Sequence, residues 1–155
     1  MKNIILYSSK SGNTEKVAFS ISSELDAIQF NLRDLTEKEM KTFWISNPAD
    51  IYWIGSGVYG GCFEKKICEF LDQHLPPDDA TIAFFATWLG RGDSANEAFQ
   101  KLEDQLLNRS QQLKILKPHF ACYGKTLFLR RTHPSSIDLK NAREWAKKLQ
   151  EKIMK

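Results

Sequence analysis

The chain has 155 residues, of which 42% are hydrophobic and 26% charged, and its net charge at pH 7 is +3. This composition is that of an ordinary globular protein, and the length predicts one domain over residues 1–155. No apolar run approaches the ~20 residues of a membrane helix, so we expect no membrane span, and no signal peptide. The mild, scattered charge does not indicate nucleic-acid binding.

The three cysteines, Cys62, Cys68 and Cys122, are odd in number and lack the spacing of a metal site. We therefore expect free thiols, which indicates the reducing cytoplasm. Cys62 follows a glycine-rich segment and could lie near a helix N-terminus, where thiolates are stabilised. We interpret Cys62 instead as a small, half-buried structural cysteine.

Residues 4–7 form an unbroken apolar or aromatic run, which predicts a short buried strand. Hydroxyl, glycine and amide residues follow, and then a helical pattern. A strand that enters a helix through such a loop presents unpaired backbone N–H groups at the positive end of the helix dipole, which is a phosphate site. Ser9, Ser11 and Thr14 can add O–H donors, and Gly12 lets the backbone approach the anion closely.

Two better-known phosphate loops do not fit this segment. A P-loop requires Lys-Ser or Lys-Thr after its last glycine, whereas Asn13 and Thr14 follow Gly12. A dinucleotide-binding fingerprint requires three spaced glycines, and this loop has one. An ordinary polar turn between strand and helix is the alternative to a phosphate site.

Short strands alternate with helices along the rest of the chain. Further strands are predicted at residues 28–32 (a half-buried edge), 51–54, 81–87 and 120–124, with 127–129 extending or repeating the last. Apolar residues at helical spacing predict helices within 17–28, 63–71, 95–106 and 142–153, and a short helix within 34–47. Ser94 with Glu97, and Ser135 with Asp138, fit capping boxes. The alternation predicts an α/β fold with a parallel sheet covered by helices on both faces.

Three loops follow the carboxyl ends of predicted parallel strands and should therefore meet at one edge of the sheet. Ligands of parallel sheets bind at this edge. The loop at residues 9–14 offers phosphate donors. The loop at residues 55–61 is rich in glycine and carries Tyr59, and the loop at residues 86–93 is rich in glycine and carries Trp88. One anion site and two aromatic loops suit a flat ring with a phosphate tail, such as FMN.

Residues 9–14, Ser-Lys-Ser-Gly-Asn-Thr, resemble the FMN phosphate loop of flavodoxins, and the resemblance to a short-chain flavodoxin covers nearly the whole chain. Residues 55–61 and 86–93 stand where the two isoalloxazine loops of that family should be. The resemblance implies a flavodoxin-like three-layer sandwich whose five-stranded parallel sheet has the order 2-1-3-4-5. It implies FMN as the cofactor and these cofactor-binding residues: Ser9, Lys10, Ser11, Gly12, Asn13, Thr14, Ser56, Gly57, Val58, Tyr59, Gly60, Gly61, Thr87, Trp88, Leu89, Gly90, Gly92 and Asp93.

The resemblance also implies a function, the transfer of single electrons between a flavodoxin reductase and an acceptor enzyme. Tyr59 and Trp88 would pack on the flavin faces and exclude water, which disfavours an anionic reduced ring. In the family a backbone carbonyl of the first isoalloxazine loop turns toward flavin N5, and we expect it at Gly57. No catalytic acid or base is required, and no metal is expected. Alternatively, the two aromatic residues only pack on the core.

A basic cluster, Lys125, Arg130, Arg131 and His133, follows the last predicted strand. It is a solvated loop, a docking patch for an acidic redox partner, or a site for an anionic substrate. Flavodoxins typically dock on basic partners through acidic rims, and this cluster departs from that pattern. Two other functions therefore stay open: an FMN-dependent reductase or dehydrogenase acting on a quinone or tetrapyrrole, and a flavin-free partner-binding module on the same fold.

Overall fold

A computed structural model describes residues 1–126 and 130–155 of the chain. Strands and helices alternate along these residues, as the sequence predicts. In chain order the elements are β1 Asn3–Ser8, α1 Asn13–Leu25, β2 Ile28–Asn31, η1 Leu32–Asp34, α2 Glu37–Lys41, α3 Phe43–Ser46, β3 Ile51–Tyr59, β4 Cys62–Phe63, α4 Lys65–Gln73, β5 Thr81–Trp88, α5 Ser94–Leu107, β6 Lys114–Tyr123 and α6 Ser136–Met154.

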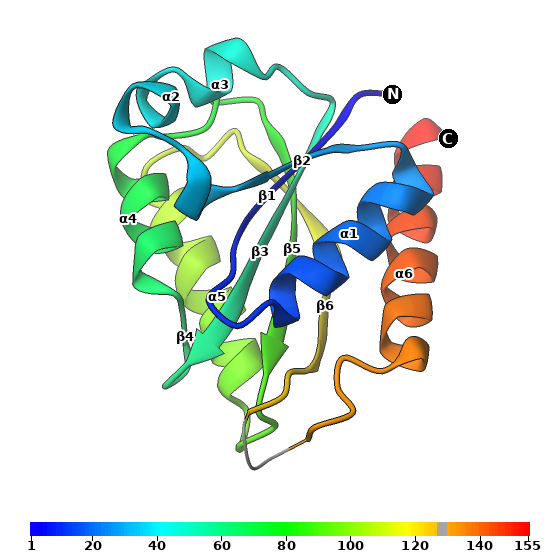
Figure 1. Ribbon diagram of the computed structural model, residues 1–155. Coiled ribbons are helices and arrows are strands. Elements are labelled where there is room, and N and C mark those ends of the chain that lie inside the picture. The colour runs from blue at the N-terminus through cyan, green and yellow to red at the C-terminus, as the bar shows by residue number, and fades with distance from the viewer. Residues whose placement is uncertain (127–129) are drawn as a thin grey trace.

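The parallel strands are arranged in the order β2-β1-β3-β5-β6, which confirms the predicted order 2-1-3-4-5. The short strand β4 is a sixth strand that the sequence did not predict, and it pairs antiparallel with β3. Ser8 pairs with Ser56, and Gly57 with Thr87, so β1, β3 and β5 reach the same edge of the sheet. This carboxyl edge lies at the bottom of Figure 1, where α1 also begins.

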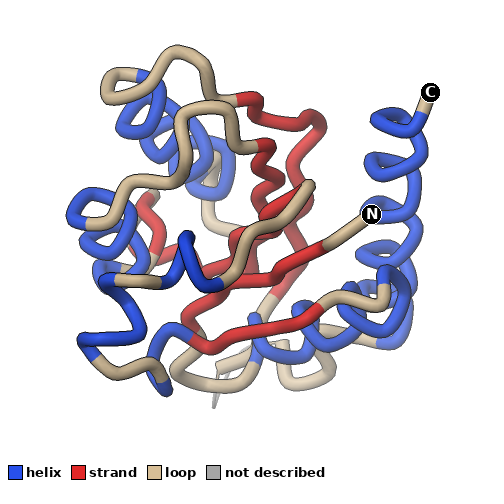
Figure 2. Tube along the Cα trace, turned by 90° about the horizontal axis from the view of Figure 1, so that it is seen from above, coloured by secondary structure: helices blue, strands red, loops and turns tan. Residues whose placement is uncertain are grey.

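Helices cover both faces of the sheet, α1 and α6 on one side and α4 and α5 on the other (Figures 1 and 2). Successive strand residues contribute to opposite faces, because side chains alternate along a strand. Trp53 and Phe85 are buried under α1 and α6, whereas their neighbours Ile54 and Phe84 are buried in the cluster on the α4 and α5 side. Burial on both faces explains why the central strands read as continuous apolar runs.

The glycine-rich segment 55–61 differs from the predicted loop, because β3 continues through it to Tyr59. Gly60 and Gly61, both with positive φ, form the turn into β4. Phe63 was predicted to lie on the following helix, but it belongs to β4, and α4 begins at Lys65. The first isoalloxazine loop of the prediction is therefore the end of a strand and a tight hairpin.

Other boundaries differ in smaller ways. The last strand was predicted at residues 120–124, but β6 begins at Lys114. The predicted capping box at Ser135 and Asp138 is present, whereas the one at Ser94 is wrong: Asp93 is the N-cap of α5, without a capping hydrogen bond from its side chain. The predicted strand at residues 127–129 lies outside the described residues.

Within residues 1–126 and 130–155, no helix is long and apolar enough to cross a membrane. The three cysteines are free thiols, as predicted. Burial raises the pKa of Cys122 to about 12 and that of Cys68 to about 11, so both thiols stay protonated at neutral pH. Cys62 is exposed on β4 and accepts a hydrogen bond from Lys101 Nζ at 3.4 Å.

Candidate functional site

The loop between β1 and α1 brings the N-terminus of a helix to the carboxyl edge of the sheet. Gly12, in a left-handed conformation with φ 82°, is the N-cap, and α1 begins at Asn13. Its N–H donates to Ser9 Oγ at 3.1 Å, which holds the loop closed. Within the described residues, no side-chain capping hydrogen bond is formed at the N-cap of α1. The remaining N–H groups there are suited to an anion.

Asn13 anchors this loop to the segment after β6. Its buried side chain donates from Nδ2 to Ser11 Oγ (3.1 Å) and to the carbonyl of Lys125 (2.9 Å). Gly124 permits this approach, because a Cβ added there would lie 2.9 Å from Asn13 Nδ2. Asn13 Oδ1 is buried and has no hydrogen-bond partner among the described residues. An orphaned acceptor of this kind favours a ligand that carries a hydroxyl or N–H donor.

The first turn of α1 is also joined to the end of β5. Thr14 Oγ1 and Thr87 Oγ1 lie 2.9 Å apart, and both residues are buried. One hydroxyl donates to the other, which leaves further hydrogen-bonding capacity on the pair. The phosphate-type loop and the second predicted ring loop are thus fixed relative to each other.

Tyr59 ends β3 and is 51% exposed. Its ring lies against Gly57, where an added Cβ would approach the Tyr59 hydroxyl to 2.8 Å. Lys10 of the phosphate-type loop lies over the ring, with Nζ 5.6 Å from the centroid, within the range of a cation–π contact. Desolvation, with a further contribution from the Glu64 carboxylate, raises the pKa of the Tyr59 phenol above its ordinary value, so the ring stays neutral.

Trp88 ends β5 and is held by the segment after β6. Its carbonyl accepts from the Gly124 N–H at 2.8 Å, and its ring centroid lies 6.0 Å from that of Tyr123. The Arg130 guanidinium stacks on Tyr123, with Cζ 3.7 Å from the centroid, and Nε donates to the Leu89 carbonyl at 3.0 Å. The indole is therefore positioned by contacts from a distant part of the chain.

These three loops and the segment after β6 surround a cavity of about 320 Å³ at the carboxyl edge of the sheet. Its volume falls at the small end of the range for ligand sites. Hydroxyl and amide groups lie in the same lining as two aromatic residues. The lining residues are Ser9, Lys10, Ser11, Asn13, Thr14, Gly57, Val58, Tyr59, Thr87, Trp88, Leu89, Gly124, Lys125 and Thr126.

Residues 4–131 match a family model described as a flavodoxin domain, which is more than half of the chain. The chain belongs to the flavodoxin family. FMN is the cofactor of this family, and the cavity fits it: it offers a helix N-terminus with hydroxyl donors, an orphaned buried acceptor and two aromatic residues. The cavity of this flavodoxin is hereafter called the flavin cavity.

Relatives of this flavodoxin include an uncharacterized protein of Methanocaldococcus jannaschii, 30% identical over 96% of this chain and 98% of the relative. Among solved structures, oxidised flavodoxin 2 from Bacillus cereus has a TM-score of 0.74 at 22% identity, covering 98% of this chain and 99% of the other. A flavodoxin from the domain Archaea has a TM-score of 0.73 at 20% identity over 100% of both chains. At these identities the solved structures establish the shared fold.

The remaining predicted site residues lie beside the flavin cavity. Gly60, Gly61, Gly92 and Asp93 line an adjoining hollow of about 440 Å³, which shares Val58, Tyr59 and Leu89 with the flavin cavity. Three further predicted residues do not line either space. Gly12 caps α1, Gly90 lies against Tyr123, and buried Ser56 donates from Oγ to the Gly57 carbonyl at 2.8 Å. Sequence reasoning missed Gly124 and Thr126 as lining residues, although a glycine directly after a strand was a usable signal.

A buried carboxylate next to the loops was also missed. Glu64 is 3% exposed, and its carboxylate pairs with Arg33 and accepts a hydrogen bond from Ser8 Oγ at 2.8 Å. Lys10 Nζ lies 3.9 Å from the same carboxylate. The Glu64 N–H donates to Ser56 Oγ at 2.9 Å. This network ties β1, η1 and β3 together close to the flavin cavity.

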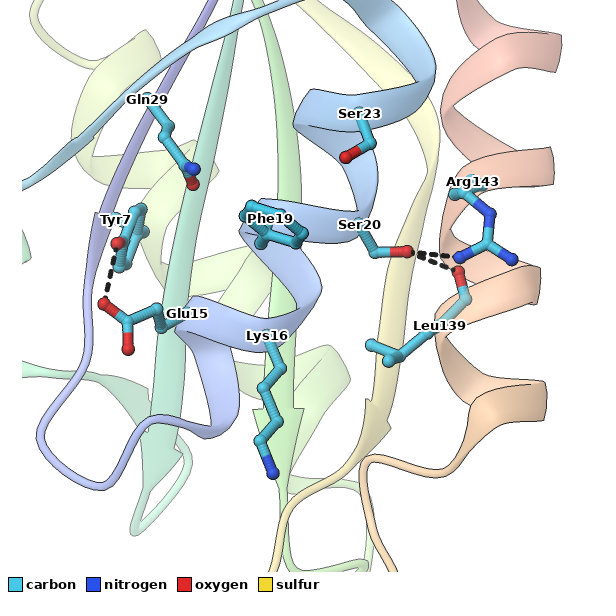
Figure 3. A pocket seen from close by; sticks show the side chains of 9 residues that line it. All are labelled: Tyr7, Glu15, Lys16, Phe19, Ser20, Ser23, Gln29, Leu139 and Arg143. Atoms are coloured by element: carbon cyan, nitrogen blue, oxygen red, sulfur yellow. Dashed lines mark hydrogen bonds between the residues drawn. The ribbon is translucent and has the colours of Figure 1, made fainter.

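A larger hollow, of about 540 Å³, lies away from these loops, along α1 (Figure 3). Phe19 projects from α1 at its centre, with Gln29 of β2 on one side and Arg143 of α6 on the other. Arg143 Nη1 donates to Ser20 Oγ at 2.7 Å, and Tyr7 donates to Glu15 Oε1 at 3.2 Å. The described lining of this hollow includes none of residues 9–14 and no glycine-rich turn, so we do not assign the flavin to it.

The structure separates the basic cluster predicted after the last strand. Lys125 lines the flavin cavity, and Arg131 lines a neighbouring hollow of about 390 Å³ with Ser11, Lys125 and Thr126. Arg130 stacks on Tyr123, whereas His133 Nδ1 pairs with Asp138 Oδ2 at 2.6 Å. One cation of the predicted cluster therefore lines the flavin cavity, a second lines the hollow beside it, and Arg130 reaches the Leu89 carbonyl, whereas the histidine belongs to the cap of α6.

Proposed function

We propose that this flavodoxin is a one-electron carrier that moves electrons between a flavodoxin reductase and an acceptor enzyme. This proposal is based on the residues that line the flavin cavity. Its lining, as far as the structure describes it, contains hydroxyl and amide groups, backbone, two aromatic rings and two lysines, but no carboxylate and no histidine. Such a lining can bind and orient a flavin, and it lacks the imidazole and carboxyl groups that most often serve as general acid or base for a substrate.

FMN would bind with its phosphate at the N-terminus of α1, next to the hydroxyls of Ser9, Ser11 and Thr14. Asn13 Oδ1, which is buried and unpartnered, would accept a hydrogen bond from the polyol chain. Tyr59 and Trp88 would pack on the ring and exclude water from it. The bound flavin supplies the electron-transfer chemistry. The residues of the chain bind it, orient it and set the polarity around it.

The carbonyl that turns toward the ring was expected at Gly57, but the turn residue Gly60 is better suited to this role. Gly57 is paired with Thr87 inside the sheet, and its carbonyl already accepts from Ser56 Oγ. Gly60 and Gly61 form the β3–β4 turn, and a Cβ at Gly60 would contact nothing within 4 Å. Gly60 is exposed in this turn and its peptide can reorient at low cost, whereas Gly61 is buried beside Glu97.

The proposed setting is the cytoplasm, where thiols such as those of Cys68 and Cys122 remain reduced. The partners are redox proteins rather than nucleic acid. A function as an FMN-dependent reductase acting on a quinone or tetrapyrrole is the second candidate. It is favoured by the cations around the cavity mouth, Lys125 and Arg131, which would attract an anionic substrate.

The test is a visible absorption spectrum of the protein after loading with FMN, followed by stepwise reduction without oxygen. A carrier is expected to show flavin bands and then a long-wavelength band at partial reduction. Direct bleaching, together with turnover of NAD(P)H and a quinone or tetrapyrrole by the isolated protein, would favour the reductase. A protein that stays colourless with excess FMN would contradict both and leave a flavin-free binding module.

A further inference from the structure

The charged side chains that line the flavin cavity itself are positive. Lys10 and Lys125 line the cavity, and Arg131 lines the hollow next to it; among the described residues, neither lining includes a carboxylate. Lys10, Lys125 and Arg131 are exposed, whereas Arg130 is partly buried. We call these four residues, Lys10, Lys125, Arg130 and Arg131, the basic rim.

Several carboxylates lie close to the basic rim. Glu64 lies 3.9 Å from Lys10 Nζ, but its charge is already matched by Arg33 in a closer pair. Asp138 forms the α6 cap with Ser135 and is hydrogen bonded to the His133 imidazole. Asp93 and Glu97 line the hollow on the other side, together with Arg91. The positive charge is therefore concentrated on the side of the cavity formed by the phosphate loop and the segment after β6.

The four positive charges of the basic rim exceed the net charge of the whole chain, which is +3. Removing these four charges from the net charge of +3 leaves −1 on all other residues. A phosphate monoester adds about two negative charges at neutral pH. The basic rim consequently remains positive when FMN is bound, by about two charges.

Arg130 of the basic rim is held in a fixed position by contacts within the chain itself. Arg130 adopts a left-handed backbone conformation, with φ 53°, which is uncommon for a residue with a side chain. Its guanidinium is stacked on Tyr123 and hydrogen bonded to the Leu89 carbonyl. Ordering this long side chain on binding costs less when it is already fixed, and a fixed guanidinium matches the geometry of a carboxylate.

From these observations we infer that the basic rim is the docking surface for a redox protein whose own electron-transfer site is surrounded by carboxylates. The inference rests on the proposed function, because the flavin cavity is where electrons enter and leave. Charge complementarity around such a site accelerates encounter and orients the partner. The mixed charges of Asp93, Glu97 and Arg91 on the opposite side of the mouth would set the direction of approach.

The test measures the rate at which FMN-loaded, reduced protein is oxidised by one-electron acceptors of opposite charge in a stopped-flow instrument. Ferricyanide is the anionic small acceptor and hexaammineruthenium(III) the cationic one. Cytochrome b5, an acidic haem protein, and cytochrome c, a basic one, are the protein acceptors. NaCl is varied from about 20 to 500 mM, which shortens the Debye length severalfold.

With ferricyanide and cytochrome b5 we expect rates that fall with salt, by roughly tenfold over this range. With hexaammineruthenium(III) and cytochrome c the rates should rise with salt. The variant K125E/R131E should flatten or reverse these slopes. A matched control, K148E/K152E, makes the same change in net charge at exposed positions near the C-terminal end of α6, far from the cavity (Figure 1), and should leave the slopes unchanged.

Bound FMN is quantified by absorbance for each variant, so that a loss of cofactor is separated from a loss of steering. Slopes of the opposite sign, or equal effects of both double variants, would overturn the inference while leaving the carrier function intact. If reduced, FMN-loaded protein transferred electrons to none of the four acceptors, the proposed function itself would fail, and the docking surface with it.

Discussion

Thr14 Oγ1 and Thr87 Oγ1 form a buried hydrogen bond of 2.9 Å between the first turn of α1 and the end of β5. The two residues are 73 positions apart in the chain. One belongs to the loop proposed to bind the phosphate, and the other adjoins Trp88, which is proposed to pack on the ring. The distance between these two proposed sites is therefore fixed by a contact in the protein rather than by the ligand.

Replacing Thr87 with valine tests this contact. Thr87→Val keeps the shape of the side chain but removes its hydroxyl, so Thr14 loses its buried partner. We expect the free energy of unfolding of the FMN-free protein to fall by about 1–2 kcal/mol, measured by urea denaturation. T42V removes an exposed hydroxyl that donates to the Lys38 carbonyl at 3.2 Å, and should cost under about 0.5 kcal/mol. Equal losses would contradict a special role for the pair.

The Glu64–Arg33 pair should contribute more to stability than exposed ion pairs do. E64Q keeps the size of the side chain but leaves the guanidinium of Arg33, itself 33% exposed, without its counter-charge. We expect a loss of about 2–3 kcal/mol, somewhat less than for a fully buried pair. The matched control is D72N, which breaks an exposed pair with Arg109 and should cost under about 1 kcal/mol. Similar losses in thermal or urea unfolding would refute this ranking.

The phosphate-type loop was predictable because its signal is local. Ser9, Ser11, Gly12 and Thr14 lie within one strand–helix connection, and hydroxyl residues before a helix indicate an anion site wherever that helix packs. The sheet order was predicted from a family resemblance, and the structure confirms it. By contrast, Asn13 contacts Lys125 across 112 positions, and no pattern along the chain indicates such a pairing.

The glycines of residues 55–61 were misassigned for a physical reason. Glycine was taken as a sign of a loop, yet Gly55 and Gly57 lie inside β3. Glycine is required at these two positions because neighbouring aromatic rings occupy the space that a side chain would fill. A Cβ at Gly55 would lie 2.1 Å from the Phe85 ring, and one at Gly57 2.8 Å from the Tyr59 hydroxyl. Glycine in a strand often marks such a close approach. The strand predicted at residues 120–124 begins earlier, at Lys114, and contains Pro118, which is tolerated because β6 is an edge strand.

Gly90 and Gly92 provide a matched pair in the loop that follows Trp88. Both have positive φ, at 73° and 56°, so alanine strains the backbone at either position by about 1–2 kcal/mol. At Gly92 the new methyl group would contact nothing within 4 Å, whereas at Gly90 it would lie 2.6 Å from the Tyr123 ring. We therefore expect G90A to lose about 1–3 kcal/mol more than G92A in urea unfolding. Equal losses would show that Tyr123 and Arg130 move aside without cost.

The stability of the protein should fall in alkaline solution because of Tyr7. The phenol is 5% exposed, and desolvation together with the neighbouring Glu15 raises its pKa from 10.0 to about 12 (Figure 3). Because the folded state holds the proton more tightly than the unfolded state, the contribution to stability is complete below pH 10. It is lost as the pH rises toward 12.

Over that interval the loss should be on the order of 2 kcal/mol, since one pKa unit corresponds to about 1.4 kcal/mol. Y7F has no proton to lose, so its free energy of unfolding, measured with urea at a series of pH values, should decline less steeply than that of the unmodified protein. E15Q removes one of the two causes and should lower the pKa of Tyr7, followed by tyrosinate absorbance, while desolvation keeps it above the ordinary value. Parallel pH profiles for Y7F and the unmodified protein would mean that Tyr7 ionises as readily in the folded chain as in the unfolded one.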